Sequence, residues 1–172
     1  MSVPLSTIKS ALKIDYDDDD ADLVRLREAA TQLIENRCQL AIDRRVARLY
    51  IASFTDTLIP EVPYESISSI AYTDSAGDLA TLDIANFRVD LTSGPIPVLR
   101  FIDPPAIYEN TAITVNYNVG YTSVPAPLTH AIIALTGAWY NNPEAVQPIG
   151  LTTVPMSVEF IISAYSTGSR LR

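Results

Sequence analysis

The chain has 172 residues, of which 48% are hydrophobic and 19% are charged, and its 12 Lys and Arg against 20 Asp and Glu give a formal net charge of −8. This composition is typical of a globular protein and excludes a largely disordered chain. The acidic balance also argues against a protein that wraps nucleic acid or docks on an anionic membrane, because such partners are bound through Lys and Arg.

Cysteine content and the first residues indicate the compartment. Cys38 is the single cysteine, so no internal disulfide can form and a reducing cytoplasm is expected. The opening MSVPLSTIKS lacks the basic and then apolar pattern of a secretory signal, and no apolar run approaches the roughly 20 residues that span a bilayer.

The first 40 residues predict two helices. Ser6 is a plausible N-cap for a short helix over residues 7–13. A longer helix is expected over residues 20–40, where acidic residues at its start and Arg37 near its end suit the helix dipole. Its apolar positions recur three and four apart, as one helical face requires: Leu23, Leu26, Ala30, Leu33, Ile34 and Cys38.

Between these helices lies an acidic run over residues 15–20 that invites a calcium interpretation. An EF-hand loop needs oxygen ligands at positions 1, 3 and 5, glycine at 6 and glutamate at 12. A frame starting at Asp17 puts Ala21 at position 5 and Asp22 at position 6, and a frame starting at Asp15 puts Leu26 at position 12. We therefore favour a solvated turn that caps the helix over an ion site or a surface for a basic partner.

The middle of the chain, residues 42–122, changes to the period of strands. Over residues 112–121, AITVNYNVGY alternates apolar and polar residues strictly, which predicts a half-buried strand. Further strands are expected over residues 44–54, 66–73 and 87–91, with a turn at residues 75–78. Prolines at 60, 63, 95, 97, 104 and 105 forbid ladder hydrogen bonds at their own positions, so they should separate short strands.

Helical patterns return after Pro125. Leu128, Ala131, Ile132, Leu135 and Trp139 share one face of a helix that should end near Asn141. Pro155 opens a last helix, with its apolar face formed by Val158, Ile161, Ile162 and Tyr165 and its end at Gly168.

These patterns predict an α+β fold in which the N- and C-terminal helices form one core and an antiparallel β-sheet or sandwich is inserted between them. Each helical zone has only one apolar face, and packing the two together covers both. The expected organisation is a helical core domain of residues 1–41 and 123–168, a β-rich insertion of residues 42–122, and a flexible tail of residues 169–172.

No catalytic or metal-binding pattern stands out. His130 is the only histidine, and one histidine with one distant cysteine falls short of the three or four ligands that zinc requires. There is no nucleophile elbow and no glycine-rich phosphate loop. We expect a protein that is not an enzyme and that needs no cofactor and no metal.

The candidate functional residues are therefore interface residues. The acidic turn and the densest basic cluster supply charged candidates, and the basic tail adds two arginines that would suit an acidic groove. Tyr140 lies off the apolar stripe of its helix, unlike Trp139, and aromatic side chains often anchor interfaces. The candidates are Asp17, Asp18, Asp19, Arg44, Arg48, Tyr140, Arg170 and Arg172.

Three segments of the chain resemble the head–tail connector (adaptor, or head-completion) proteins of long-tailed bacteriophages and gene transfer agents. Residues 8–42 match the family's short helix, acidic turn and long helix. Residues 62–90 resemble the β insertion of its longer members. Residues 113–146, with a strand ending in Gly120-Tyr121 and a helix ending in Trp139-Tyr140, are the most specific stretch.

The resemblance implies a structural virion protein, made in the host cytoplasm, that forms a ring of about twelve copies beneath the portal protein in the neck. Such a ring extends the channel through which DNA passes without sequence-specific binding, and it presents a surface to the next neck or tail protein. We expect the long helix and the β zone to meet neighbouring copies. The alternatives are a tail terminator or other neck ring, a small β-rich carbohydrate- or protein-binding module, and, least favoured, a hydrolase.

Overall fold

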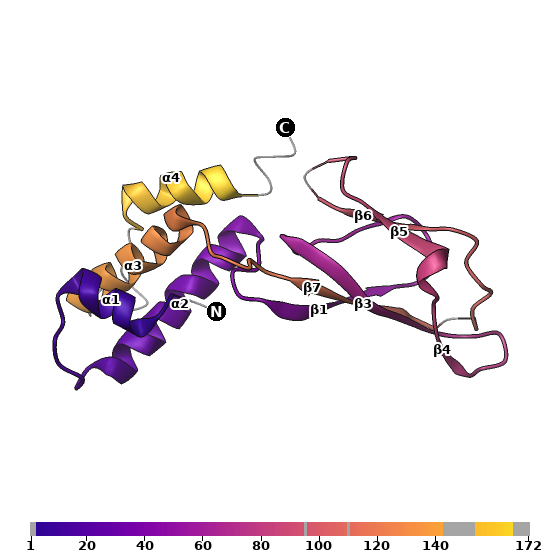
Figure 1. Cartoon of the computed structure of the whole chain (residues 1–172), viewed down its shortest axis with the longest axis horizontal. Helices are drawn as coiled ribbons and strands as arrows, with labels where there is room; N and C mark the ends of the chain where they lie inside the picture. Colours follow the sequence, from indigo (N-terminus) through magenta and orange to yellow (C-terminus); the bar gives the residue numbers. More distant parts are fainter. Residues whose placement is uncertain (1–2, 95, 110, 143–153, 167–172) are drawn as a thin grey trace. The chain divides into compact units, whose positions relative to one another are not determined.

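The computed structural model describes residues 3–94, 96–109, 111–142 and 154–166 (Figure 1). It contains helices and antiparallel sheets, which confirms the α+β class. Its contacts divide the chain into two compact units. Among the described residues, one unit is built from the chain before Asp43 together with the chain after Gly120, and the other is built from Asp43–Gly120.

Within the described ranges, four helices form the first unit, which we call the helical unit. They are α1 (Leu5–Leu12), α2 (Asp20–Cys38), α3 (Ala126–Asn141) and α4 (Met156–Tyr165). Helix α3 contacts each of the other three, so the two ends of the chain pack together (Figure 1). The apolar stripes that the sequence indicates meet in one buried cluster, which includes Leu23 and Ile34 of α2, Leu128 and Leu135 of α3, and Val158 of α4.

The ends of the first two helices differ slightly from the prediction. Helix α1 starts at Leu5 with Pro4 at the N-cap position and no side-chain cap, so the prediction of Ser6 as the cap is wrong. Proline at this position still suits a helix start, because it lacks an N–H that would need a partner. Both helices end on left-handed residues, Lys13 (φ 58°) and Gln39 (φ 55°), which turn the chain sharply.

Two antiparallel sheets form the second unit, which we call the β unit. A four-stranded sheet has the order β1-β7-β3-β4 and a three-stranded sheet the order β2-β6-β5. In chain order the strands are β1 (Arg45–Ile51), β2 (Thr57–Leu58), β3 (Tyr64–Thr73), β4 (Leu79–Thr81), β5 (Phe87–Asp90), β6 (Val98–Phe101) and β7 (Ile113–Val119), with the 3-10 helix η1 (Ile84–Asn86) before β5. Pro63, which follows a cis peptide bond, and Pro97 each lie just before a strand, as the sequence predicts.

Strand β7 is the centre of the β unit. Its four apolar residues are buried and alternate with half-buried polar ones, as expected from the sequence. This apolar face points toward the second sheet, and Phe54 lies edge-on to both Tyr72 and Phe101, with ring centroids 5.5 and 5.0 Å away. The polar face of β7 therefore looks outward from the sandwich, and we call it the outer face of the four-stranded sheet.

Gly120 ends β7 where the chain leaves the β unit. It has φ +110°, a conformation that side chains disfavour, and its N–H donates to the carbonyl of Pro63 at 3.0 Å. A Cβ atom at this position would lie 2.4 Å from the carbonyl oxygen of Asp43 and 2.6 Å from the Cα of Arg44. Only glycine allows the outgoing strand to lie this close to the incoming one.

Candidate assembly interface

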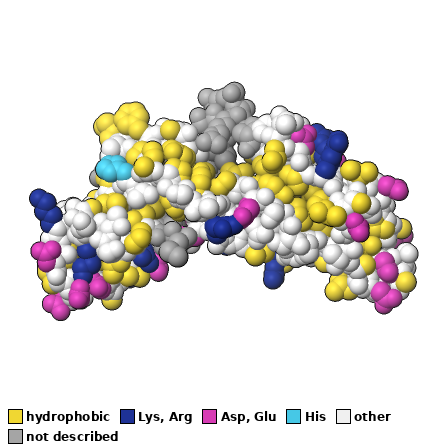
Figure 2. Space-filling model, viewed as in Figure 1, with side chains coloured by type: hydrophobic (Ala, Val, Ile, Leu, Met, Phe, Trp, Pro, Cys, Tyr) yellow, Lys and Arg dark blue, Asp and Glu magenta, His cyan; other side chains and the backbone are white. Residues whose placement is uncertain are grey.

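The acidic turn before α2 is organised by one lysine. Lys9 of α1 reaches Asp17 at 2.5 Å and Asp20 at 2.7 Å, and these two carboxylates raise the pKa of its ammonium group. Asp18 stays exposed at the tip of the turn. Acidic side chains gather at this end of the helical unit, with basic ones among them (Figure 2). The turn is thus partly neutralised within the chain, but it still presents free carboxylates to solvent.

Asp19 connects the turn to α3. The hydroxyl of Tyr140 donates to Asp19 at 2.5 Å and lies 2.9 Å from the hydroxyl of Tyr16. The Asp19 carboxylate, which accepts this bond, raises the pKa of Tyr140 because it favours the protonated form of the hydroxyl. Asp19 occupies the N-cap position of α2 without a side-chain cap, so the expected capping role of this turn is wrong at Asp19.

The outer face of the four-stranded sheet carries polar side chains along β7 and β3. Asn118 donates to Ser66 at 2.9 Å and Asn116 donates to Ser69 at 3.0 Å, which links β7 to β3 by side chains as well as by backbone. From β1, Arg48 lies opposite Asn116 in the register, so it shares this face. Arg48 is exposed and makes no ion pair with any residue that the structure describes.

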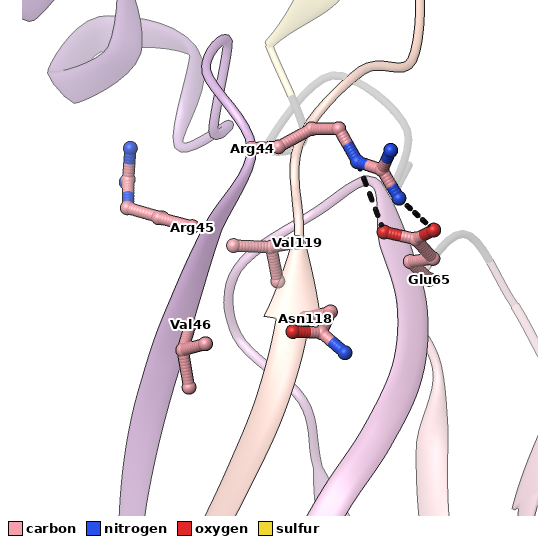
Figure 3. Close-up of a pocket in the computed structure, with 6 residues that line it drawn as sticks. All are labelled: Arg44, Arg45, Val46, Glu65, Asn118 and Val119. Carbon is pink, nitrogen blue, oxygen red and sulfur yellow. Dashed lines mark hydrogen bonds and ion pairs between the residues drawn. The ribbon is translucent and has the colours of Figure 1, made fainter.

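Arg44 lines a shallow open depression of about 320 Å³ at one end of this sheet (Figure 3). Its guanidinium forms a two-pronged ion pair with Glu65, with one Nε–Oε2 distance of 3.2 Å, and Glu65 raises the pKa of Arg44. Arg45 points away from this pair and binds Glu61 at 2.9 Å. Both arginines are paired within the β unit, so Arg48 carries the uncompensated charge of β1.

Several large apolar side chains project from the surface. Val46 and Tyr50 of β1 are 59% and 63% exposed, and Leu79 of β4 is 83% exposed. On the helical unit, Met156 and Phe160 form an exposed pair one turn apart on α4, where yellow side chains project in Figure 2. The sequence alone does not reveal these residues as candidates, because no local pattern shows that an apolar side chain is exposed.

The predicted interface residues fall into three groups in the structure. Asp17, Asp19, Arg44 and Tyr140 have intramolecular partners, whereas Asp18 and Arg48 are exposed and make no described ion pair. Arg170 and Arg172 lie outside the described residues. The role of all eight in an interface stays a prediction, to which Glu65 is added as the unforeseen partner of Arg44.

The described residues also bear on metal binding and on side-chain reactivity. Among them no group of three His, Cys, Asp or Glu is placed to hold a metal ion. His130 is exposed in α3, and Cys38 is fully buried with a thiol whose pKa burial raises to about 11. None of the helices in the described ranges combines the length and the apolar character needed to cross a membrane.

Comparison with known proteins gives a consistent result. Residues 3–75, from α1 through β3, match the family described as phage gp6-like head-tail connector protein. No curated protein sequence matches the chain. Solved structures that share its fold include a chain in the neck of an empty GTA particle computed with C6 symmetry (TM-score 0.79, 20% identity, covering 96% of this chain and 90% of that one). They also include a chain in the virion of a native gene transfer agent particle (TM-score 0.78, 19% identity, covering 96% and 90%) and a chain in the neck of a native GTA particle computed with C12 symmetry (TM-score 0.72, 20% identity, covering 97% and 92%). The resemblance to head–tail connector proteins is thus confirmed.

Proposed function

We propose that this chain, which resembles head–tail connector proteins, is a structural adaptor subunit in the neck of a phage-like particle, where it joins head to tail. The observation that carries this proposal is the likeness of its fold, over 96% of the chain, to a chain from the neck of a GTA particle. The family match of residues 3–75 supports the same assignment from sequence. Two compact units with exposed charged and apolar surfaces suit a subunit that contacts several neighbouring proteins.

The adaptor acts as a ring of identical copies, for which we propose twelve. A ring needs a heterologous interface, in which two different surfaces of each copy meet and the rotation closes. Two of the similar structures come from necks computed with C6 and C12 symmetry, which is compatible with this number. One side of the ring docks under the portal protein, and the other receives the next neck or tail protein.

DNA passes through the channel of this ring without sequence-specific binding. Twelve copies at −8 carry roughly −96 (12 × −8) before counterions screen them within about 10 Å. An acidic channel wall repels phosphates, so DNA slides rather than binds. The protein has no catalytic role in this proposal, since the ring works by contact and by charge.

Helix α2 supplies one of the contacts between copies. Its exposed side carries an uncharged stripe, Ala29, Gln32 and Asn36, on an otherwise charged helix. A neighbouring copy that covers this stripe would leave any introduced charge unpaired and desolvated, which is costly.

The test is the mass of the assembly that the chain forms with the portal protein, measured by analytical ultracentrifugation. Gln32→Glu with Asn36→Glu should abolish the ring, whereas Ser6→Glu, an equally exposed change on α1 that suits the helix dipole, should leave it intact. A wild-type chain that forms no ring with the portal would overturn the proposed function. A ring that tolerates both glutamates would remove only α2 from the interface.

A further inference from the structure

We propose that neighbouring copies in the ring join edge to edge, with β1 of one β unit pairing with β4 of the next. This inference rests on the proposed ring and names the surfaces that meet in it. The occupant of each open sheet edge is a second copy of this chain. The joint is heterologous because the two edges differ, which is the property that a ring requires.

Both outer strands of the four-stranded sheet are open. In the order β1-β7-β3-β4, no strand among the described residues pairs with the far side of β1 or of β4. Strand β1 is seven residues long, and its register with β7 is regular along its whole length. An edge this long and regular is a template for pairing with another chain. Natural proteins therefore cover such an edge or protect it with charged side chains.

The two edges carry opposite charge. Strand β1 and the residue before it hold Arg44, Arg45 and Arg48, of which Arg48 has no ion-pair partner in the described part of the chain. Strand β4 is flanked by Asp78 and Asp83, both exposed and neither within an ion pair that the structure describes. A basic edge therefore meets an acidic edge when β1 faces β4.

The same charges oppose the other pairings. Joining β1 to a second β1 would bring Arg48 against Arg48, and joining β4 to β4 would bring aspartates together. Like charges across strands destabilise a pair, so charge acts against a closed two-fold dimer and selects the head-to-tail joint.

Strand direction also favours this joint. Each neighbour in the sheet is antiparallel, so with four strands β1 and β4 run in opposite directions. Rotation about a ring axis that lies along the strands keeps the direction of each strand. The β4 of one copy then meets the β1 of the next in the antiparallel sense, which forms the more stable ladder.

Exposed apolar side chains complete the joint. Val46 and Tyr50 lie on the outer face of the sheet, in register with Asn118 and Thr114, and Leu79 lies on the same face opposite Thr73. With Tyr50 placed beside Leu79 of the next copy, two exposed apolar side chains become a cross-strand pair. The antiparallel register then places Arg48 opposite Thr81. Asp83 follows two residues later on the same face, next to Arg48. Cross-strand pairs of this kind stabilise a sheet.

Charge-swap variants of the full chain, assembled on the portal protein and observed by electron microscopy, test the joint. The β1 variant carries Arg48→Glu and Tyr50→Glu, and the β4 variant carries Asp78→Lys and Leu79→Lys. All four positions are exposed. Each variant alone should form no ring, and an equimolar mixture should restore rings because acidic β1 then meets basic β4. Arg88→Glu on β5, the same reversal on the other sheet, is the control and should assemble normally.

Hydrogen exchange of the wild-type chain is the second readout, because it does not depend on how the variants fold. Amide exchange over residues 45–51 and 79–81 should slow at least 10-fold on assembly, whereas β7 in the middle of the sheet should change little. Rings from either variant alone, or unchanged exchange in β1, would overturn the edge joint while leaving the adaptor function standing. Absence of any wild-type ring would overturn both.

Discussion

The hydroxyl of Tyr140 donates a hydrogen bond of 2.5 Å to the carboxylate of Asp19, which lies 121 residues earlier in the chain. This bond fastens the end of α3 to the acidic turn that precedes α2. The turn is therefore held from two sides, by Lys9 of α1 and by Tyr140, even though most of its carboxylates face solvent. A segment that looks like a free charged loop in the sequence is a fixed feature of the helical unit.

Replacing Tyr140 by phenylalanine should lower the melting temperature and speed amide exchange in residues 15–20, because Asp19 loses its donor. The pKa of Tyr140 is raised above its ordinary value of 10, so the stabilising bond is complete below pH 10 and is lost as the pH rises further. The variant should therefore lose less stability above pH 10 than the wild type. Tyr165→Phe is the control, since Tyr165 packs against the core with no described hydroxyl partner; equal behaviour of the two variants would contradict the account.

Gly120→Ala should destabilise the protein by about 2–5 kcal/mol, which is the sum of backbone strain and forced overlap with a rigid neighbour. The neighbouring atoms belong to the backbone of Asp43 and Arg44. Backbone atoms cannot shift aside as easily as the end of a flexible side chain. Gly77→Ala is the matched control, because Gly77 also has positive φ but its nearest atom lies 4.0 Å away. It should cost only about 1–2 kcal/mol of strain. Urea unfolding measures both, and equal losses would show that the close approach at Gly120 does not matter.

The environment of Asp90 makes the stability of the β unit depend on pH in the acid range. Its carboxylate accepts hydrogen bonds from Ser93, Thr92 and Arg100, and these bonds hold its pKa well below the usual range. A lowered pKa gives stability that is present above pH 4 and lost as the pH falls toward the folded value. Asp90→Asn should flatten the loss of stability below pH 4, measured as the melting temperature of the full chain. Asp78→Asn, which changes a carboxylate with no described cation partner, should keep the wild-type profile.

The sequence predicts elements well where the pattern is long. The spacing in α2 and the strict alternation in β7 each place a buried face correctly. Three short strands of two to four residues, β2, β4 and β6, are not predicted, because so few residues show a period only weakly; β5, with four residues, is predicted over residues 87–91. Local rules also mislead at Ser6, because Pro4 already provides a backbone angle suited to the start of the helix.

The partners of the candidate interface residues could not be predicted from the sequence. Charge pattern singles out Asp19 and Arg44, but their partners Tyr140 and Glu65 lie 121 and 21 residues away. Such pairs depend on tertiary packing, which no local window contains. The open edges of the sheet depend on strand order for the same reason.

Cys38 gives a probe of the helical unit. The thiol is fully buried between α2 and α4, 3.7 Å from the carbonyl of Ile162, and its pKa is raised to about 11. It should resist alkylation at pH 8 until the unit opens. Ile34→Ala, which removes buried side-chain volume next to it, should cost about 3 kcal/mol and speed labelling by about 100-fold. Labelling of the native wild-type chain as fast as that of an unfolded chain would contradict this packing.

Electron microscopy of the chain assembled with its portal protein and DNA-filled head tests the adaptor role most directly. We predict a ring of twelve copies between portal and tail, with the DNA channel passing through its centre and the β units touching edge to edge. Density for this chain elsewhere in the particle, or a neck that closes and joins a tail without it, would contradict the assignment.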